Sequence, residues 1–231
     1  MQGKTALMLF GALAILGHCA GMATDVYSGF AAGVRIGLVS ATSLSFEHVA
    51  PLFQAISLAD ARTGHYLAVL FIPLGIFGVL QIFAALNPRQ HPETYALLLF
   101  GILTVVHGMF FHGSLAFVAG ALQTESELLP YFNSLSQPFG KLLLAGDVLV
   151  SGIFVLIAAF RVTVFPRLFA LWNPVLIQAA LLMLIALAPY PLDHLLWLTL
   201  FNASLALWYL GTTIVIGKSA SPDLPDTLRP T

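Results

Sequence analysis

Charged residues are scarce in this chain and make up only 8% of its 231 residues. Soluble domains usually contain about 25% charged residues, because these side chains cover a surface that faces water. Hydrophobic residues reach 59%. A chain of this composition needs lipid around it, so we predict an integral membrane protein with membrane lipids as partners.

Cysteine and net charge are also scarce. Cys19 is the only cysteine, which excludes an internal disulfide. The formal net charge is −1, so the chain lacks the positive field that attracts nucleic acid. Composition therefore predicts no nucleic-acid partner, and it leaves cofactors and the oligomeric state open.

Six apolar stretches are each long enough for a membrane-spanning helix, which needs about 20 residues. They predict an all-α fold, with six transmembrane helices forming one bundle over residues 1–217. Residues 218–231 hold three prolines and few apolar side chains, which predicts a disordered cytoplasmic tail. Segments 87–93, 124–138, 161–167 and 189–193 are rich in helix breakers and separate the later spans. The predicted spans are Thr5–Thr24, Tyr66–Leu86, Tyr95–Ala121, Phe139–Phe160, Phe169–Ala188 and Leu195–Ile216.

The first predicted span also resembles a secretory signal peptide, because a lysine precedes an apolar run that ends in small residues. We favour an uncleaved helix, since the ionisable His18 and Asp25 have no role in a segment that is removed. Residues 28–64 are too polar for a clear span and too apolar for a plain loop. They predict an amphipathic or re-entrant segment on the outer face, with a seventh span as the alternative.

Positive charge favours the cytoplasmic side of a membrane. With six spans and a cytoplasmic N-terminus, only Arg35, Arg62 and Lys141 lie outside. This asymmetry predicts that both ends of the chain are cytoplasmic. The cytoplasmic set is Lys4, Arg89, Arg161, Arg167, Lys218 and Arg229.

Several predicted spans carry polar residues at helical spacing. Polar groups inside a membrane usually face the interior of the bundle and often mark function. Spacings of seven or four residues place both members of a pair on one face of a helix. The pairs are His18 with Asp25, His107 with Ser114, Asp147 with Ser151, and Asn202 with Tyr209; Gln81 and Gln178 are further polar residues within spans.

His107 and His112 lie in one span, but five residues separate them by about 140° around the helix and about 7.5 Å along it. They are therefore not expected to bind one ion, and we predict no metal site. Counting back from the span ends places His18, His112, Asp147 and Asn202 about 10–13 Å below the outer surface. His107 falls near the bilayer centre. The sequence thus predicts one polar layer in the outer leaflet.

Asp147 is the costliest of these groups to bury, because inserting a carboxylate in a span costs about 3 kcal/mol or more. We expect it to be protonated or held as an ion pair by His112 or His18. Glu47 and His48 either cover the polar layer or form a solvated pair on the surface. The candidate catalytic residues are Asp147, His112, His18 and Glu47, and the candidate ligand-binding residues are His107, His48, Asp25, Asn202, Tyr209 and Ser114.

Five short motifs together resemble a group of small bacterial multi-span membrane proteins of unknown function. They are "GHCAGMATD", a histidine-bearing outer segment, "LGIFGVLQIF", "VVHGMFFHG" and "FPRLFALWNP". The resemblance implies a location in the bacterial inner membrane, and it implies no activity.

These observations leave several functions open. The first is an intramembrane enzyme in which Asp147 and the histidines perform acid–base chemistry on a lipidic or isoprenoid-like substrate. The second is a haem- or ligand-binding protein, with His18 and either His107 or His112 as axial ligands. A transporter is less favoured, because the sequence shows no internal repeat. The last is a non-catalytic accessory subunit in which the polar layer only holds helices together.

Overall fold

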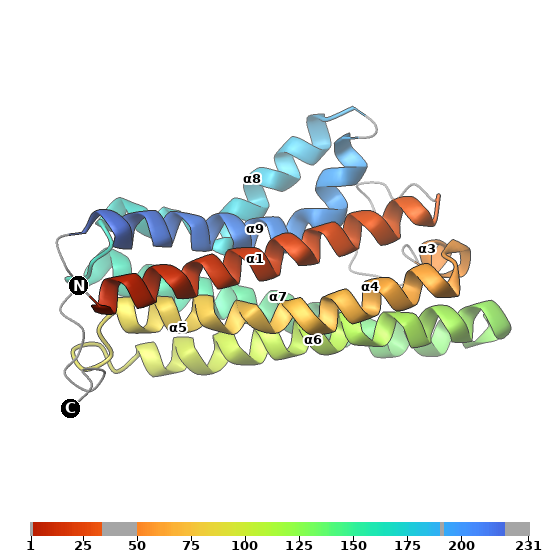
Figure 1. The fold of residues 1–231 in the computed structure, drawn as a ribbon, viewed down its shortest axis with the longest axis horizontal. Coiled ribbons are helices and arrows are strands. Elements are labelled where there is room, and N and C mark those ends of the chain that lie inside the picture. Colours follow the sequence, from red (N-terminus) through yellow and green to blue (C-terminus); the bar gives the residue numbers. More distant parts are fainter. Residues whose placement is uncertain (1, 34–49, 190–191, 220–231) are drawn as a thin grey trace.

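The computed structural model describes residues 2–33, 50–189 and 192–219, and this part of the chain contains helices and no strand. The predicted all-α class is therefore confirmed for the described residues. Figure 1 shows long helices lying side by side along one axis. The elements are α1 (Gln2–Ala31), α3 (Ala50–Ala55), α4 (Leu58–Phe71), η2 (Ile72–Leu74), α5 (Gly75–Ala85), α6 (Thr94–Thr124), η3 (Ser126–Leu128), α7 (Leu129–Phe160), η4 (Arg167–Leu171), α8 (Pro174–Leu187) and α9 (Leu192–Lys218).

Side chains and prolines set several helix boundaries. Ser57 precedes α4, and its hydroxyl oxygen accepts a hydrogen bond from the backbone N–H of Asp60 at 3.1 Å. Asn173 caps α8 in the same way, with Leu176 as donor, and Pro174 occupies the first turn. The pair Asn173–Pro174 thus starts the helix, because asparagine is a favoured cap and proline fits the first turn.

Pro73 interrupts the second long helix. It lies in the short 3-10 turn η2, which separates α4 from α5. Proline has no backbone N–H and clashes with the preceding turn of an α-helix, so it breaks the regular hydrogen-bond ladder. The helix nevertheless continues in α5, so that 58–85 forms one long rod with a local break.

The long helices surround a common interior (Figure 1). Helix α1 packs along α9 on one side and along α4 and α5 on the other. Helix α6 packs against α4, α5 and α7, while α8 packs mainly against α9. The ends of α1 and α9 meet, because Lys4 Nζ donates to the carbonyl of Ser219 at 2.8 Å. The first and last helices thus begin and end at the same end of the bundle.

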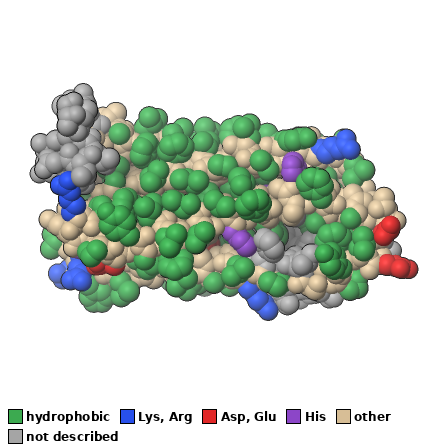
Figure 2. All heavy atoms as spheres, turned by 90° about the horizontal axis from the view of Figure 1, so that it is seen from below, with side chains coloured by type: hydrophobic (Ala, Val, Ile, Leu, Met, Phe, Trp, Pro, Cys, Tyr) green, Lys and Arg blue, Asp and Glu red, His purple; other side chains and the backbone are tan. Residues whose placement is uncertain are grey.

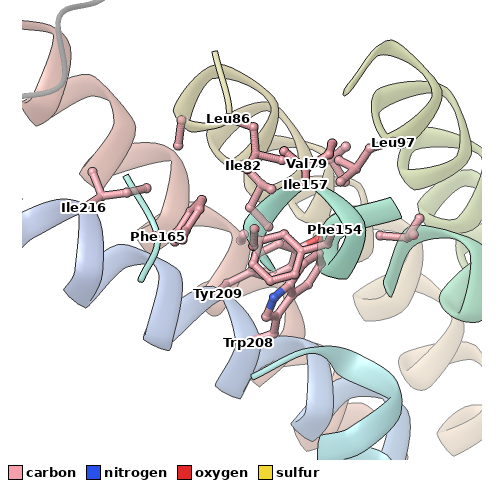
Figure 3. Close-up of a cluster of buried hydrophobic side chains, with 14 of the residues drawn as sticks. Val79, Ile82, Leu86, Leu97, Phe154, Ile157, Phe165, Trp208, Tyr209 and Ile216 are labelled. Carbon is pink, nitrogen blue, oxygen red and sulfur yellow. The ribbon is translucent and has the colours of Figure 1, made fainter. Parts of the chain in front are cut away.

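Aromatic side chains from α7, α9 and the η4 segment fill the centre of the core. Phe154 is completely buried, and its ring centroid lies 5.4 Å from that of Phe165 and 5.3 Å from that of Trp208. Tyr209 lies beside Trp208, as Figure 3 shows. Ring pairs at these separations add packing energy beyond simple burial. This cluster therefore joins α7 to α9.

Within the described residues, five helices are long and apolar enough to cross a membrane: Gly3–Ala31, Leu58–Ala85, Thr94–Thr124, Lys141–Phe160 and Leu198–Lys218. The fifth predicted span, Phe169–Ala188, is divided. Its first residues form η4, and α8 has only 14 residues, which is about 21 Å of helix against a hydrocarbon core of about 30 Å. Six complete spans are therefore not confirmed.

Other predicted boundaries also differ. Segment 124–138, expected to be a breaker region, is largely helical, and Pro138 lies inside α7. The predicted outer segment 28–64 overlaps the end of α1 and the start of α4. The polar residues near these helix ends do not terminate the helices. Residues 34–49 lie outside the described residues, and so do Glu47 and His48. The predicted tail begins at Lys218, the last residue of α9, and 220–231 lie outside the described residues.

The outer surface of the bundle is mainly apolar. Figure 2 shows one face on which hydrophobic side chains cover most of the area, with the few charged ones mostly near the two ends. Phe117 is 71% exposed and Phe160 is 75% exposed. Water disfavours a continuous apolar surface of this kind, whereas lipid accommodates it. Composition, helix length and surface thus all suggest a membrane location.

Candidate functional site

Three helices bring four predicted site residues into one polar network, which we call the relay: His112 on α6, Asp25 and His18 on α1, and Asn202 on α9. Asn202 Nδ2 donates to Asp25 Oδ2 at 2.8 Å, and Asn202 Oδ1 lies 3.0 Å from Nδ1 of His18. Nδ1 of His112 lies 3.6 Å from Asp25 Oδ1, an ion-pair distance rather than a hydrogen bond. The structure thus links His18, Asn202, Asp25 and His112 in one chain of contacts across three helices.

Exposure changes along the relay. The side chains of His112 and Asp25 keep 19% and 17% of their accessible surface, whereas His18 keeps 3% and Asn202 6%. The relay therefore runs from a partly exposed histidine–carboxylate pair to a buried histidine. A carboxylate beside an imidazole can orient the ring and stabilise its protonated form, which is the arrangement that general acid–base catalysis uses.

Asp147 belongs to a different cluster. Its Oδ2 accepts a hydrogen bond from Gln178 Nε2 at 2.8 Å, and the same amide nitrogen lies 3.2 Å from Ser204 Oγ. The expected ion pair of Asp147 with His112 or His18 is therefore wrong. Asp147 faces α8 and α9, while the histidines face Asp25 and Asn202. The depth of a residue along the bundle axis does not say toward which neighbouring helix its side chain points.

Tyr209 lies between the two clusters. Its ring stacks on His18 with centroids 5.6 Å apart, and Asp147 affects it only through space, without a hydrogen bond among the described contacts. Tyr209 is 2% exposed, so this stacking lies in the core. The predicted polar layer is thus two separate clusters.

Gln81 forms a third polar cluster, nearer the end of the bundle where α1 begins. Its Nε2 donates to the carbonyl of Leu7 at 3.0 Å and to Thr213 Oγ1 at 2.9 Å. Its Oε1 accepts from Thr212 Oγ1 at 3.1 Å. The amide is fully buried, and each of its polar atoms has a hydrogen-bond partner. We interpret this cluster as a structural contact that holds α1, α5 and α9 together.

The remaining candidates lie elsewhere. Ser114 is exposed and donates to the carbonyl of Phe111 in its own helix. The prediction that Ser114 faces the interior of the bundle together with His107 is therefore wrong. His107 is half-buried on the continuous helix α6. That helix carries no bulge that would bring it to His112, in agreement with the predicted angular separation.

Sequence reasoning missed Ser204, Thr212 and Thr213. They follow Asn202 on α9, and Ser204 and Thr212 are eight residues apart, which places both on the face that carries Trp208. That spacing was the available signal. Serine and threonine occur in many spans without functional meaning, so the spacing alone does not distinguish them.

No protein-family model, curated protein or solved structure matches this chain. The contacts above therefore carry the functional argument on their own.

A haem between His18 and a second histidine does not fit this packing. Nδ1 of His18 faces Asn202, and its other ring nitrogen, Nε2, faces the backbone of α5. A methyl group added at Gly75 would lie only 3.0 Å from that nitrogen, so a porphyrin has no room there. Within the described residues, no three His, Cys, Asp or Glu side chains come close enough to hold a metal ion.

The relay depends on the absence of a side chain at Gly21. A methyl group there would lie 2.7–2.9 Å from three atoms of the Asn202 amide. We expect Gly21→Ala to displace Asn202 and to lower the free energy of unfolding by about 1–3 kcal/mol. Reversible unfolding in mixed micelles measures this change.

Gly152→Ala is the matched control, because a methyl group at Gly152 meets nothing within 4 Å. Alanine favours a helix over glycine by up to about 1 kcal/mol, so this variant should be neutral or more stable. Equal losses for the two variants would contradict the close approach of α1 to Asn202.

Proposed function

We propose that this chain is a multi-pass membrane protein in which the His112–Asp25 pair performs acid–base chemistry on a lipidic, isoprenoid-like molecule. The observation that carries this proposal is the relay itself. A partly exposed imidazole lies 3.6 Å from a carboxylate that Asn202 holds from the buried side. A structural polar contact needs no exposed member, whereas a reactive pair must reach its substrate.

The surroundings of the pair favour an apolar substrate. Phe110 on α6 is 62% exposed, and Tyr27 and Phe30 on α1 are 43% and 45% exposed. They lie on the same helices as His112 and Asp25, but spacings of two or five residues place them on other faces of those helices. They show that the outer surface of α1 and α6 around the pair is apolar. We therefore infer that the substrate approaches from the lipid.

Five helices suited to spanning support the membrane location. The cations expected on the cytoplasmic side cluster at one end, where Lys4 contacts Ser219 and Arg161 Nε lies 3.4 Å from Glu93 Oε1. The backbone N–H of Glu93 and the Arg161 charge hold the pKa of this carboxyl group below its usual value. We propose that this end is cytoplasmic, and the motif resemblance supports a bacterial inner membrane.

Lipid analysis of membranes from producing cells tests the proposed chemistry. We expect the intact chain to change the abundance of at least one lipid species, and we expect Asp25→Asn and His112→Gln to abolish the change. Ser114→Ala is the control, because Ser114 lies on the same helix and bonds only to its own backbone among the described contacts. Identical lipid profiles for the intact chain and a folded Asp25→Asn variant would refute the enzyme proposal.

A second candidate function is a non-catalytic accessory subunit. The Gln81 cluster favours it, because it shows that this bundle uses buried polar groups as glue. In that case Asp25→Asn would change stability and leave every lipid species unchanged. The lipid experiment therefore separates the two candidates directly.

A further inference from the structure

Four buried side-chain polar atoms have no hydrogen-bond partner among the described residues: His18 Nε2, His65 Nδ1, Ser151 Oγ and Trp208 Nε1. Three of them lie in the core, because His18, Ser151 and Trp208 are only 3%, 4% and 1% exposed. Leaving a buried donor or acceptor unsatisfied is costly, and folded proteins rarely do so without a bound molecule. Three such atoms in one core therefore require an explanation.

Two of the three atoms adjoin the Asp147 cluster. Ser151 is one turn from Asp147 on α7, and Trp208 is one turn from Ser204 on α9. Two contacts connect α7 to α9: Asp147 to Ser204 through Gln178, and Phe154 to Trp208. The contact that comes first along α7 also comes first along α9. The two helices are therefore parallel here, and Ser151 lies between these contacts.

The donors and acceptors of this group define the chemistry of what they bind. Trp208 can only donate, Ser151 can donate or accept, and a carboxylate such as Asp147 accepts. Of the two carboxyl oxygens of Asp147, only Oδ2 accepts a hydrogen bond from a described residue. Oδ1 is left for another donor. A mixed set of this kind suits water, which donates and accepts, better than it suits a cation or an anion.

We propose that Asp147, Ser151 and Trp208 form a bound-water site in the core between α7 and α9. The water accepts from Trp208 Nε1, exchanges a hydrogen bond with Ser151 Oγ and donates to Asp147 Oδ1. Tyr209 lies beside Trp208, as Figure 3 shows, and its ring stacks on His18. This site does not depend on the enzyme proposal.

Radiolytic hydroxyl-radical labelling of the full chain in nanodiscs, read by mass spectrometry, tests the site. Radicals formed from a bound water modify the side chains that contact it, even where bulk solvent is excluded. We expect Trp208 to be modified well above Phe154, which is equally buried and joins the same aromatic cluster. Trp172, which is 40% exposed, serves as the internal reference for each sample.

Ser151→Ala removes one partner of the water. Losing a hydrogen bond worth about 1 kcal/mol lowers the affinity for the water about fivefold, so the modification of Trp208 should fall. Modification of Trp172 should not change, and Phe154 should stay at background, which shows that the core of the variant is folded. Background modification of Trp208 in the intact chain, or equal modification in the folded variant, would overturn the proposal.

A density map of the intact chain at a resolution that shows water gives a second test without any variant. Density within hydrogen-bond distance of both Ser151 Oγ and Trp208 Nε1 is the expected result. A map in which these atoms bond to protein groups, with no density between them, would refute the site.

Discussion

Phe154→Ala is expected to lower the free energy of unfolding by about 3–5 kcal/mol, as other large-to-small changes at buried aromatic positions do. Phe154 is completely buried and contacts the rings of Phe165, Phe169 and Trp208. Inside a membrane the loss comes chiefly from the cavity and the missing contacts, because lipid is as apolar as the core. Reversible unfolding in mixed micelles provides the measurement.

Phe160→Ala is the matched control for this prediction. It makes the same substitution on the same helix, but Phe160 is 75% exposed on the outer surface. We expect a change within about 0.5 kcal/mol, since surface substitutions rarely exceed that. If both variants lost the same stability, α7 would not pack as described.

Asn202→Ala should have the second largest effect. Asn202 is the only described residue that contacts both Asp25 and His18, and the change removes both hydrogen bonds at once. It leaves His18, which is 3% exposed, without a partner for Nδ1. We expect a loss of about 2 kcal/mol in the free energy of unfolding, together with the loss of any relay-dependent lipid change.

A double-mutant cycle distinguishes the relay from a general loss of packing. Asn202→Ala and Asp25→Asn act on the same hydrogen bond, so their combined cost should be smaller than the sum of the separate costs. Gln81→Leu is the reference, because Gln81 bonds to other partners and should combine additively with Asn202→Ala. Additivity in both cycles would show that Asn202 and Asp25 do not interact.

The helical class and most helix positions were readable from the sequence. Long apolar stretches and the small number of charges leave little choice beyond membrane helices, and Asn173 with Pro174 marks the start of α8. The boundaries that failed are those set by packing. Helix α7 continues through Pro138 although the segment before it is rich in helix breakers, and α8 is too short for a complete span although its composition is apolar.

The candidate site was predictable only in part. Helical spacing correctly placed His18 and Asp25 on one side of α1, and helix depth placed His112 and Asn202 near them. Depth gives the height of a residue in the bundle and not the helix that it faces. Asp147 was therefore assigned to the histidines, whereas its side chain bonds to Gln178.

The distance between the His112 ring and the Asp25 carboxyl group tests the central claim most directly. Solid-state NMR of the full chain in lipid can measure it, with 15N in histidine side chains and 13C in aspartate carboxyl groups. The account predicts short-range dephasing that disappears in His112→Gln and remains in His107→Gln, since Nδ1 of His112 lies 3.6 Å from Asp25 Oδ1. Dephasing that is absent from the intact chain, or that persists unchanged in His112→Gln, would contradict it.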